Sequence, residues 1–97
     1  MRISDKKREK IYEQILAFLY SVSPKPLFTL NIAQEIARDE EFVKILLLEL
    51  KKKDLVIEIR KNPQGLPYSK RSRWKLSDSA YRAYKTHQNK QQESINP

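Results

Sequence analysis

Lysine and arginine side chains are concentrated in the second half of this 97-residue chain. Residues 1–49 carry eight Lys and Arg against eight Asp and Glu, whereas residues 50–97 carry twelve against four, so the whole net charge of +8 lies in the second half. Cations gathered on one surface attract polyanions and displace their counterions. A lysine-rich run can also be only a solvated surface, but segregation of this degree favours a nucleic-acid-binding face.

The candidate contact residues lie in two stretches, the end of an amphipathic segment and a loop that contains proline and glycine. Their cations can neutralise phosphates, and an arginine can also enter a minor groove. The apolar candidate, Leu48, can meet only a thymine methyl group. Together the candidates are Lys44, Leu48, Lys51, Lys52, Arg60, Lys61, Lys70, Arg71 and Arg73.

Several chemistries have no residues to support them. The chain has no cysteine, one histidine (His87) and one glycine, so disulfides, thiol catalysis, cysteine-ligated zinc and a glycine-rich phosphate loop are excluded. No enzyme activity, cofactor, metal or small-molecule substrate is therefore expected. The longest apolar run, Ile45–Leu48, is too short to cross a bilayer, and no signal-peptide pattern opens the chain. We expect no membrane contact and a cytoplasmic, nucleoid-associated protein.

The first half of the chain predicts three helices. The first spans about 4–22 and begins at Ser4, with an apolar arc wide enough to face both the domain core and a second subunit. Leu27 and Phe28 suggest a short edge strand. The second helix spans about 30–37 with Thr29 as its N-cap, and the third spans about 40–53 with Asp39 as its N-cap.

The third helix has two contrasting faces. At 100° per residue its core arc is formed by Phe42, Val43, Leu46, Leu47 and Leu50. The opposite face carries Lys44, Ile45 and Leu48, and it contains no Arg, Gln, Ser or Thr. Reading of a base sequence by this helix alone is therefore not expected. Ile45 and Leu48 fit either thymine methyl groups or the surface of a protein.

The second half predicts a hairpin and a final helix. Residues 55–76 form two strands joined by a loop that contains Gly65, and Trp74 is expected in the core. Ser77 is the expected N-cap of a helix over about 78–87. Residues 88–97 are polar and aperiodic, which predicts a disordered tail after a single domain over 1–87.

Two junctions carry a resemblance to a known family. The run Lys51–Ile57, a basic helix end that enters a strand, and the run Leu76–Asp78 resemble the corresponding junctions of winged-helix transcription regulators, including multidrug regulators. Such proteins are small prokaryotic, archaeal, viral or plasmid regulators. The resemblance implies an α+β, mainly α fold: a winged helix-turn-helix with three to four helices and a two- to three-stranded antiparallel hairpin wing.

The same resemblance implies binding of double-stranded DNA by a transcription regulator. The third helix would enter the major groove, and the basic wing would lie on the backbone or in the minor groove. A homodimer would form through the first and last helices. Two alternatives remain open: a winged helix that binds another protein, and an accessory DNA-binding protein of replication or plasmid maintenance.

Overall fold

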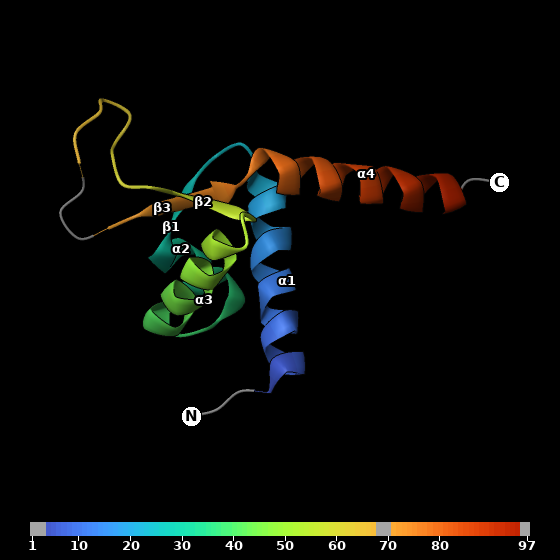
Figure 1. Cartoon of the computed structure of the whole chain (residues 1–97), viewed down its shortest axis with the longest axis horizontal. Helices are drawn as coiled ribbons and strands as arrows, with labels where there is room; N and C mark the ends of the chain where they lie inside the picture. The colour runs from blue at the N-terminus through green and yellow to red at the C-terminus, as the bar shows by residue number, and fades with distance from the viewer. Residues whose placement is uncertain (1–3, 68–70, 96–97) are drawn as a thin grey trace.

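The computed structural model describes residues 4–67 and 71–95, and this part of the chain folds into four helices and one three-stranded antiparallel sheet (Figure 1). The expected fold class is confirmed. In chain order the elements are α1 (Asp5–Val22), β1 (Leu27–Phe28), α2 (Thr29–Ile36), α3 (Glu40–Lys52), β2 (Val56–Ile59), β3 (Arg73–Leu76) and α4 (Asp78–Ile95).

Helix α1 forms one side of the core. It begins as predicted, with the Ser4 side chain accepting a hydrogen bond from the Lys7 backbone N–H at 3.3 Å. The wide apolar arc buries Ile11, Ile15, Leu16 and Leu19. No helix in the described ranges combines the length and the apolar character that a membrane crossing requires.

The start of α2 differs from the prediction. Thr29 is the first helical residue, and Phe28, whose side chain makes no capping bond, occupies the N-cap position. The Thr29 hydroxyl instead accepts a hydrogen bond from the buried indole N–H of Trp74 at 2.8 Å. A buried indole N–H needs an acceptor, and this need takes the hydroxyl away from capping.

The turn between α2 and α3 depends on two alanines. Ala33 is buried, which lets the two helices approach closely. Ala37 ends α2 in the left-handed conformation with φ 55°, and the next residue, Arg38, donates its backbone N–H to the Ala33 carbonyl at 3.0 Å. The Asp39 side chain then accepts from the Phe42 backbone N–H at 3.1 Å, so the predicted cap of α3 is confirmed.

The sheet has the order β1-β3-β2, with β3 in the centre. The expected edge strand is confirmed, since Leu27 pairs with Trp74. On the other side Glu58 is opposite Trp74 and Val56 is opposite Leu76. Trp74 is fully buried, as predicted, and the inward face of the sheet therefore carries Val56, Trp74 and Leu76 against the helices.

The junction after α3 closes in a Schellman arrangement. The backbone N–H of Leu55 donates to the carbonyl of Leu50 and that of Asp54 donates to the carbonyl of Lys51, both at 3.0 Å. Asp54 has φ 60°, the left-handed conformation that glycine usually supplies at this point. Ser77 bonds to the Asp54 carbonyl through its hydroxyl at 2.8 Å, which ties the helix end to the start of α4.

Helix α4 is longer than predicted. Ser77 caps it as expected, accepting from the Ala80 backbone N–H at 3.1 Å. The helix does not end near 87 but continues to Ile95, so the prediction of a disordered tail is wrong for residues 88–95; residues 96–97 lie outside the described part. Gln, Lys and Glu dominate this segment and are good helix formers, and no Gly or Pro interrupts it. The helix projects away from the domain, on the side opposite the wing (Figure 1).

Candidate nucleic-acid interface

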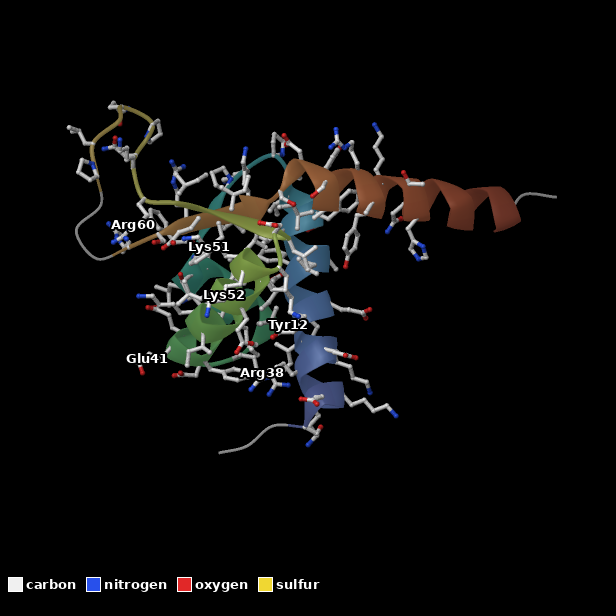
Figure 2. All side chains as sticks on the ribbon, in the orientation of Figure 1. Tyr12, Arg38, Glu41, Lys51, Lys52 and Arg60 are labelled. Atoms are coloured by element: carbon white, nitrogen blue, oxygen red, sulfur yellow. The ribbon has the colours of Figure 1, made fainter. Side chains whose placement is uncertain are left out.

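Helix α3 divides into a buried and an exposed side, as its sequence predicted. Val43, Leu46, Leu47 and Leu50 are fully buried, while Phe42 is half-buried against the same core. On the outer side Ile45 is 54% exposed and Leu48 is 38% exposed. Lys44, Lys51 and Lys52 are exposed on the same side, and Figure 2 shows the last two along the helix as it approaches the sheet.

The wing and α3 meet at a cleft of about 350 Å³, which we call the wing cleft. It is lined by Phe28, Thr29, Leu30, Asn31, Glu40, Lys44, Arg71 and Ser72. The guanidinium of Arg71 lies over the Phe28 ring, 4.8 Å from its centroid, in a cation–π contact that fixes the arginine near the cleft. Two cations from distant parts of the sequence, Lys44 and Arg71, are thereby brought to one place.

The residues of α2 in this cleft were missed by the sequence analysis. Leu30 is 50% exposed and Asn31 is also exposed, both in the first turn of the helix. The amide of Asn31 can donate to a phosphate oxygen. The sequence did contain a sign of this exposed position. Leu30 and Asn31 lie just after the edge strand and do not belong to the apolar stripe of the helix that faces the core.

Lys51, a predicted contact residue, is held by an ion pair. Its Nζ lies 2.8 Å from Oε1 of Glu58, whose other oxygen accepts from the Ser72 hydroxyl at 2.6 Å. Burial acts to raise the pKa of Glu58, but the hydrogen bonds from Lys51 and Ser72 and the charges of Lys51 and Arg60 outweigh it, so that the pKa is lowered. Glu58, in β2, is therefore held as a carboxylate that joins the end of α3 to Ser72, the residue before β3.

The wing itself is braced from within. Arg73, also a predicted contact, donates from Nη2 to the backbone carbonyl of Lys61 at 3.2 Å. Beyond it the side chain of Asn62 accepts from the backbone N–H groups of Gln64 and Leu66, at 3.0 and 2.9 Å. Gly65 completes the turn with φ 85°. Arg73 thus shapes the wing on which Arg60 and Lys61 are displayed.

The predicted contact residues consequently differ in their availability. Within residues 4–67 and 71–95, five of the predicted cations are exposed and belong to no ion pair: Lys44, Lys52, Arg60, Lys61 and Arg71. Figure 2 places Arg60 farther out along the wing than Lys51 and Lys52, at the point where β2 enters the wing loop. The remaining predicted cation, Lys70, lies outside the described residues.

A second polar cluster ties α3 to α1. Arg8 Nη1 lies 3.1 Å from Oε2 of Glu49, and the Tyr12 hydroxyl donates to Oε1 of the same carboxylate. Tyr12 points from α1 toward α3 (Figure 2). Burial, and then the hydrogen bond and charge of Glu49, raise the pKa of Tyr12. This cluster fixes the position of the exposed face of α3 relative to α1.

The arrangement of these elements defines a winged helix-turn-helix protein: two helices joined by a tight turn, then a hairpin whose loop forms the wing beside the second of them. Neither a protein-family model nor a curated protein sequence matches the chain. Solved structures do match, over 93–94% of this chain in three cases, and they confirm the expected winged-helix fold.

One match is the Staphylococcus aureus regulator MepR in a complex with DNA, with a TM-score of 0.71 and 20% identity over 94% of this chain and 75% of that chain. A mutant MepR from a multidrug-resistant S. aureus clinical isolate gives a TM-score of 0.59 and 26% identity, covering 80% of this chain and 57% of that one. A mutant of Lactococcus lactis ZitR in its apo form gives a TM-score of 0.62 and 16% identity, covering 93% of this chain and 65% of that one. MepR is a transcription regulator of a multidrug efflux pump.

Proposed function

We propose that this protein binds double-stranded DNA as a transcription regulator, with α3 in the major groove and the wing on the backbone or in the minor groove. The observation that carries the proposal is the wing cleft, where Lys44 of α3 and Arg71 of the wing converge beside the exposed face of α3. A helix flanked by cations from a neighbouring hairpin is suited to a groove whose two edges are phosphate backbones.

Binding begins with electrostatics. If the five exposed cations each meet a phosphate, the logarithm of affinity falls with the logarithm of salt concentration with a slope of about −4.5 on duplex DNA. Lys70 would add one further contact of the same kind. A titration of genomic duplex fragments at several salt concentrations measures this slope. A slope shallower than about −2 would contradict the proposed interface.

A charge reversal at Arg71 tests the site within the molecule. The Arg71→Glu variant is preferable to one at Arg73, because Arg73 also braces the wing through the Lys61 carbonyl. We expect weaker binding to every duplex and a salt slope reduced by about one unit. The matched control is Lys25→Glu, since the pairing of Leu27 with Trp74 places the exposed Lys25 at the end of the sheet away from the wing. This control should keep nearly the full affinity.

The protein would act as a homodimer through α1 and α4. A groove of about 780 Å³ lies between these helices, lined by Lys10, Glu13, Gln14, Ala17, Ala83, Tyr84, His87 and Gln88. In a twofold contact, a residue pair that forms from the first copy to the second also forms from the second to the first. Lys10 of each copy can therefore pair with Glu13 of the other. A helix of 18 residues that projects from its domain also gains stability from a partner.

Sedimentation of the full chain tests the dimer separately from DNA binding. We expect a dimer of the 11.6 kDa chain, and the Ala83→Glu variant should shift it toward the monomer because the substitution puts a charge into the groove. Two joined copies would bind half-sites about one helical turn apart, within the cytoplasm and associated with the nucleoid. A wild-type monomer at the concentrations used for DNA binding would rule out the dimer alone.

A winged helix that binds another protein is the second candidate, and the exposure of Ile45 and Leu48 favours it. Under this alternative duplex binding is weak in the wild type and insensitive to Arg71→Glu. Replacing Ile45 and Leu48 with serine would then abolish capture of a protein partner. A role in replication or plasmid maintenance uses the same DNA-binding surface and differs in the site on DNA that is bound.

A further inference from the structure

Of the side chains that read bases by hydrogen bonding, the exposed face of α3 carries only lysine and glutamate. Between Glu40 and Lys52 the sequence contains no Arg, Asn, Gln, Ser or Thr. Lys44 lines the wing cleft together with Arg71, which directs it to the backbone at the edge of the groove. Lys51 is paired with Glu58. The exposed side chains left along the face are Glu41, Ile45 and Leu48, followed by Lys52 at the last residue of the helix.

Resting on the proposed DNA binding, we propose that α3 reads thymine by its 5-methyl group, through Ile45 and Leu48. These two side chains are 54% and 38% exposed although both are aliphatic. In the major groove the thymine methyl is the one apolar group that a base pair presents, and its position distinguishes A·T from T·A and both from the G·C pairs. Burying the two side chains against methyl groups removes apolar surface from water on both molecules.

The surroundings of the two side chains favour DNA as the occupant over an apolar protein surface. Cations lie on the side of the wing, where Lys44 and Arg71 line the wing cleft, and at the end of α3, where Lys52 is exposed one turn after Leu48; at the start of α3, Glu40 and Glu41 line a hollow with Lys44 and Ile45. A polyanion satisfies these charges while the apolar centre is covered. An apolar partner would instead leave the cations at its edge without counterparts.

The spacing of the pair sets the arrangement of the thymines. Residues three apart are neighbours on a helix surface and are separated by about 4.5 Å along the axis. Consecutive base pairs are about 3.4 Å apart. Ile45 and Leu48 are therefore placed to meet methyl groups on adjacent base pairs. Glu41, one turn before Ile45, repels phosphates but can accept a hydrogen bond from a cytosine amine in the same groove.

Replacement of thymine by uracil tests this reading, because uracil lacks the methyl group and keeps the same hydrogen-bonding edge. Duplexes bound by the full chain are selected from a random library, and each thymine of the selected sequence is then replaced by uracil in turn. We expect adjacent thymines in each half-site, and about fourfold weaker binding at each contacted position. A selected site in which no uracil weakens binding overturns the inference while DNA binding itself stands.

Variants of the two residues complete the test. Each of the variants Leu48→Ala and Ile45→Ala should lose the uracil effect at one of the sensitive positions. At that position the variant should bind the thymine duplex and the uracil duplex equally well. Alanine keeps the helix, and both side chains are at least one third exposed, so the fold is retained. The matched control is Lys52→Ala, which should weaken thymine and uracil duplexes by the same factor. If uracil still weakens binding at the same positions in both alanine variants, residues other than Ile45 and Leu48 contact the methyl groups, and the inference is overturned. Failure to bind any duplex at low salt removes the proposed function together with it.

Discussion

Glu58 provides the sharpest test of how the wing is joined to α3. In Glu58→Gln the carboxylate becomes an amide of the same shape. The amide oxygen can still accept from the Ser72 hydroxyl, but the ion pair with Lys51 at 2.8 Å is lost. A hydrogen bond between charged groups contributes about 1.5–3 kcal/mol, and this one is weakened by solvent because the Lys51 side chain is 51% exposed. We expect a loss of about 1–2 kcal/mol at pH 7, a fall in Tm of about 5–15 °C.

The stabilisation by the Glu58 ion pair depends on pH. The folded-state pKa of Glu58 is lowered, so the stabilisation is complete above the unfolded-state pKa of 4.5 and is lost as the pH falls through the folded-state pKa. Thermal melts of the wild type and of Glu58→Gln should therefore differ at pH 7 and converge as the pH falls through the lowered folded-state pKa of Glu58. The control is Glu35→Gln, which removes an exposed carboxylate of α2 and should leave the melts nearly unchanged.

The same variant should have the opposite effect on DNA. Without the carboxylate, Lys51 is released toward the proposed phosphate contacts, so we expect tighter binding at low salt and a salt slope steeper by about one unit. Stability and affinity then change in opposite directions. Identical melting of variant and wild type at pH 7, or a difference that persists unchanged at pH 3, would refute the role given to the ion pair.

Three further substitutions test separate parts of the fold. Ala37→Gly relieves a left-handed φ of 55° and should raise the free energy of unfolding by about 0.5–1 kcal/mol in chemical denaturation, whereas Gln34→Gly, inside the same helix, should lower it by a similar amount. Trp74→Phe leaves the buried Thr29 hydroxyl without its donor and creates a void, so we expect a loss of about 2–4 kcal/mol by the same method; an unchanged midpoint would refute the packing described. Burial and the Glu49 carboxylate raise the pKa of Tyr12, so Tyr12→Phe should remove one tyrosine that ionises above pH 10 in an ultraviolet titration. If the tyrosine that disappears from the titration has an ordinary pKa, the contact with Glu49 is contradicted.

Local sequence patterns predicted most of the fold because local physics decides it. The apolar spacing of α1 and α3 and the caps at Ser4, Asp39 and Ser77 are all readable within a few residues of one another. The edge strand followed from two apolar residues after a proline. The length of α4 was missed because a polar helix has no apolar stripe, so its residues look like a tail.

Contacts between distant residues account for the remaining differences. Thr29 is a good N-cap by type, but Trp74, which takes its hydroxyl, is 45 positions away. Lys51 looked available for DNA because the register that places Glu58 beside it cannot be read from residue types alone. The cleft formed with Arg71 likewise depends on how the wing folds back on α2 and α3. The positive charge of the site could be predicted, whereas the sharing of that charge among partners could not.

Helix α1 makes two different contacts on neighbouring turns. Arg8 and Tyr12 hold Glu49 of α3, while Lys10 and Glu13 line the groove with α4. In the proposed dimer α1 contacts α3 on one face and the other subunit on the opposite face of the same turns, so a tilt or rotation of α1 at the subunit contact moves the DNA-facing helix with it. The spacer between the two half-sites would therefore be measured by the angle of α1, and substitutions in the groove would alter the preferred spacer without touching DNA.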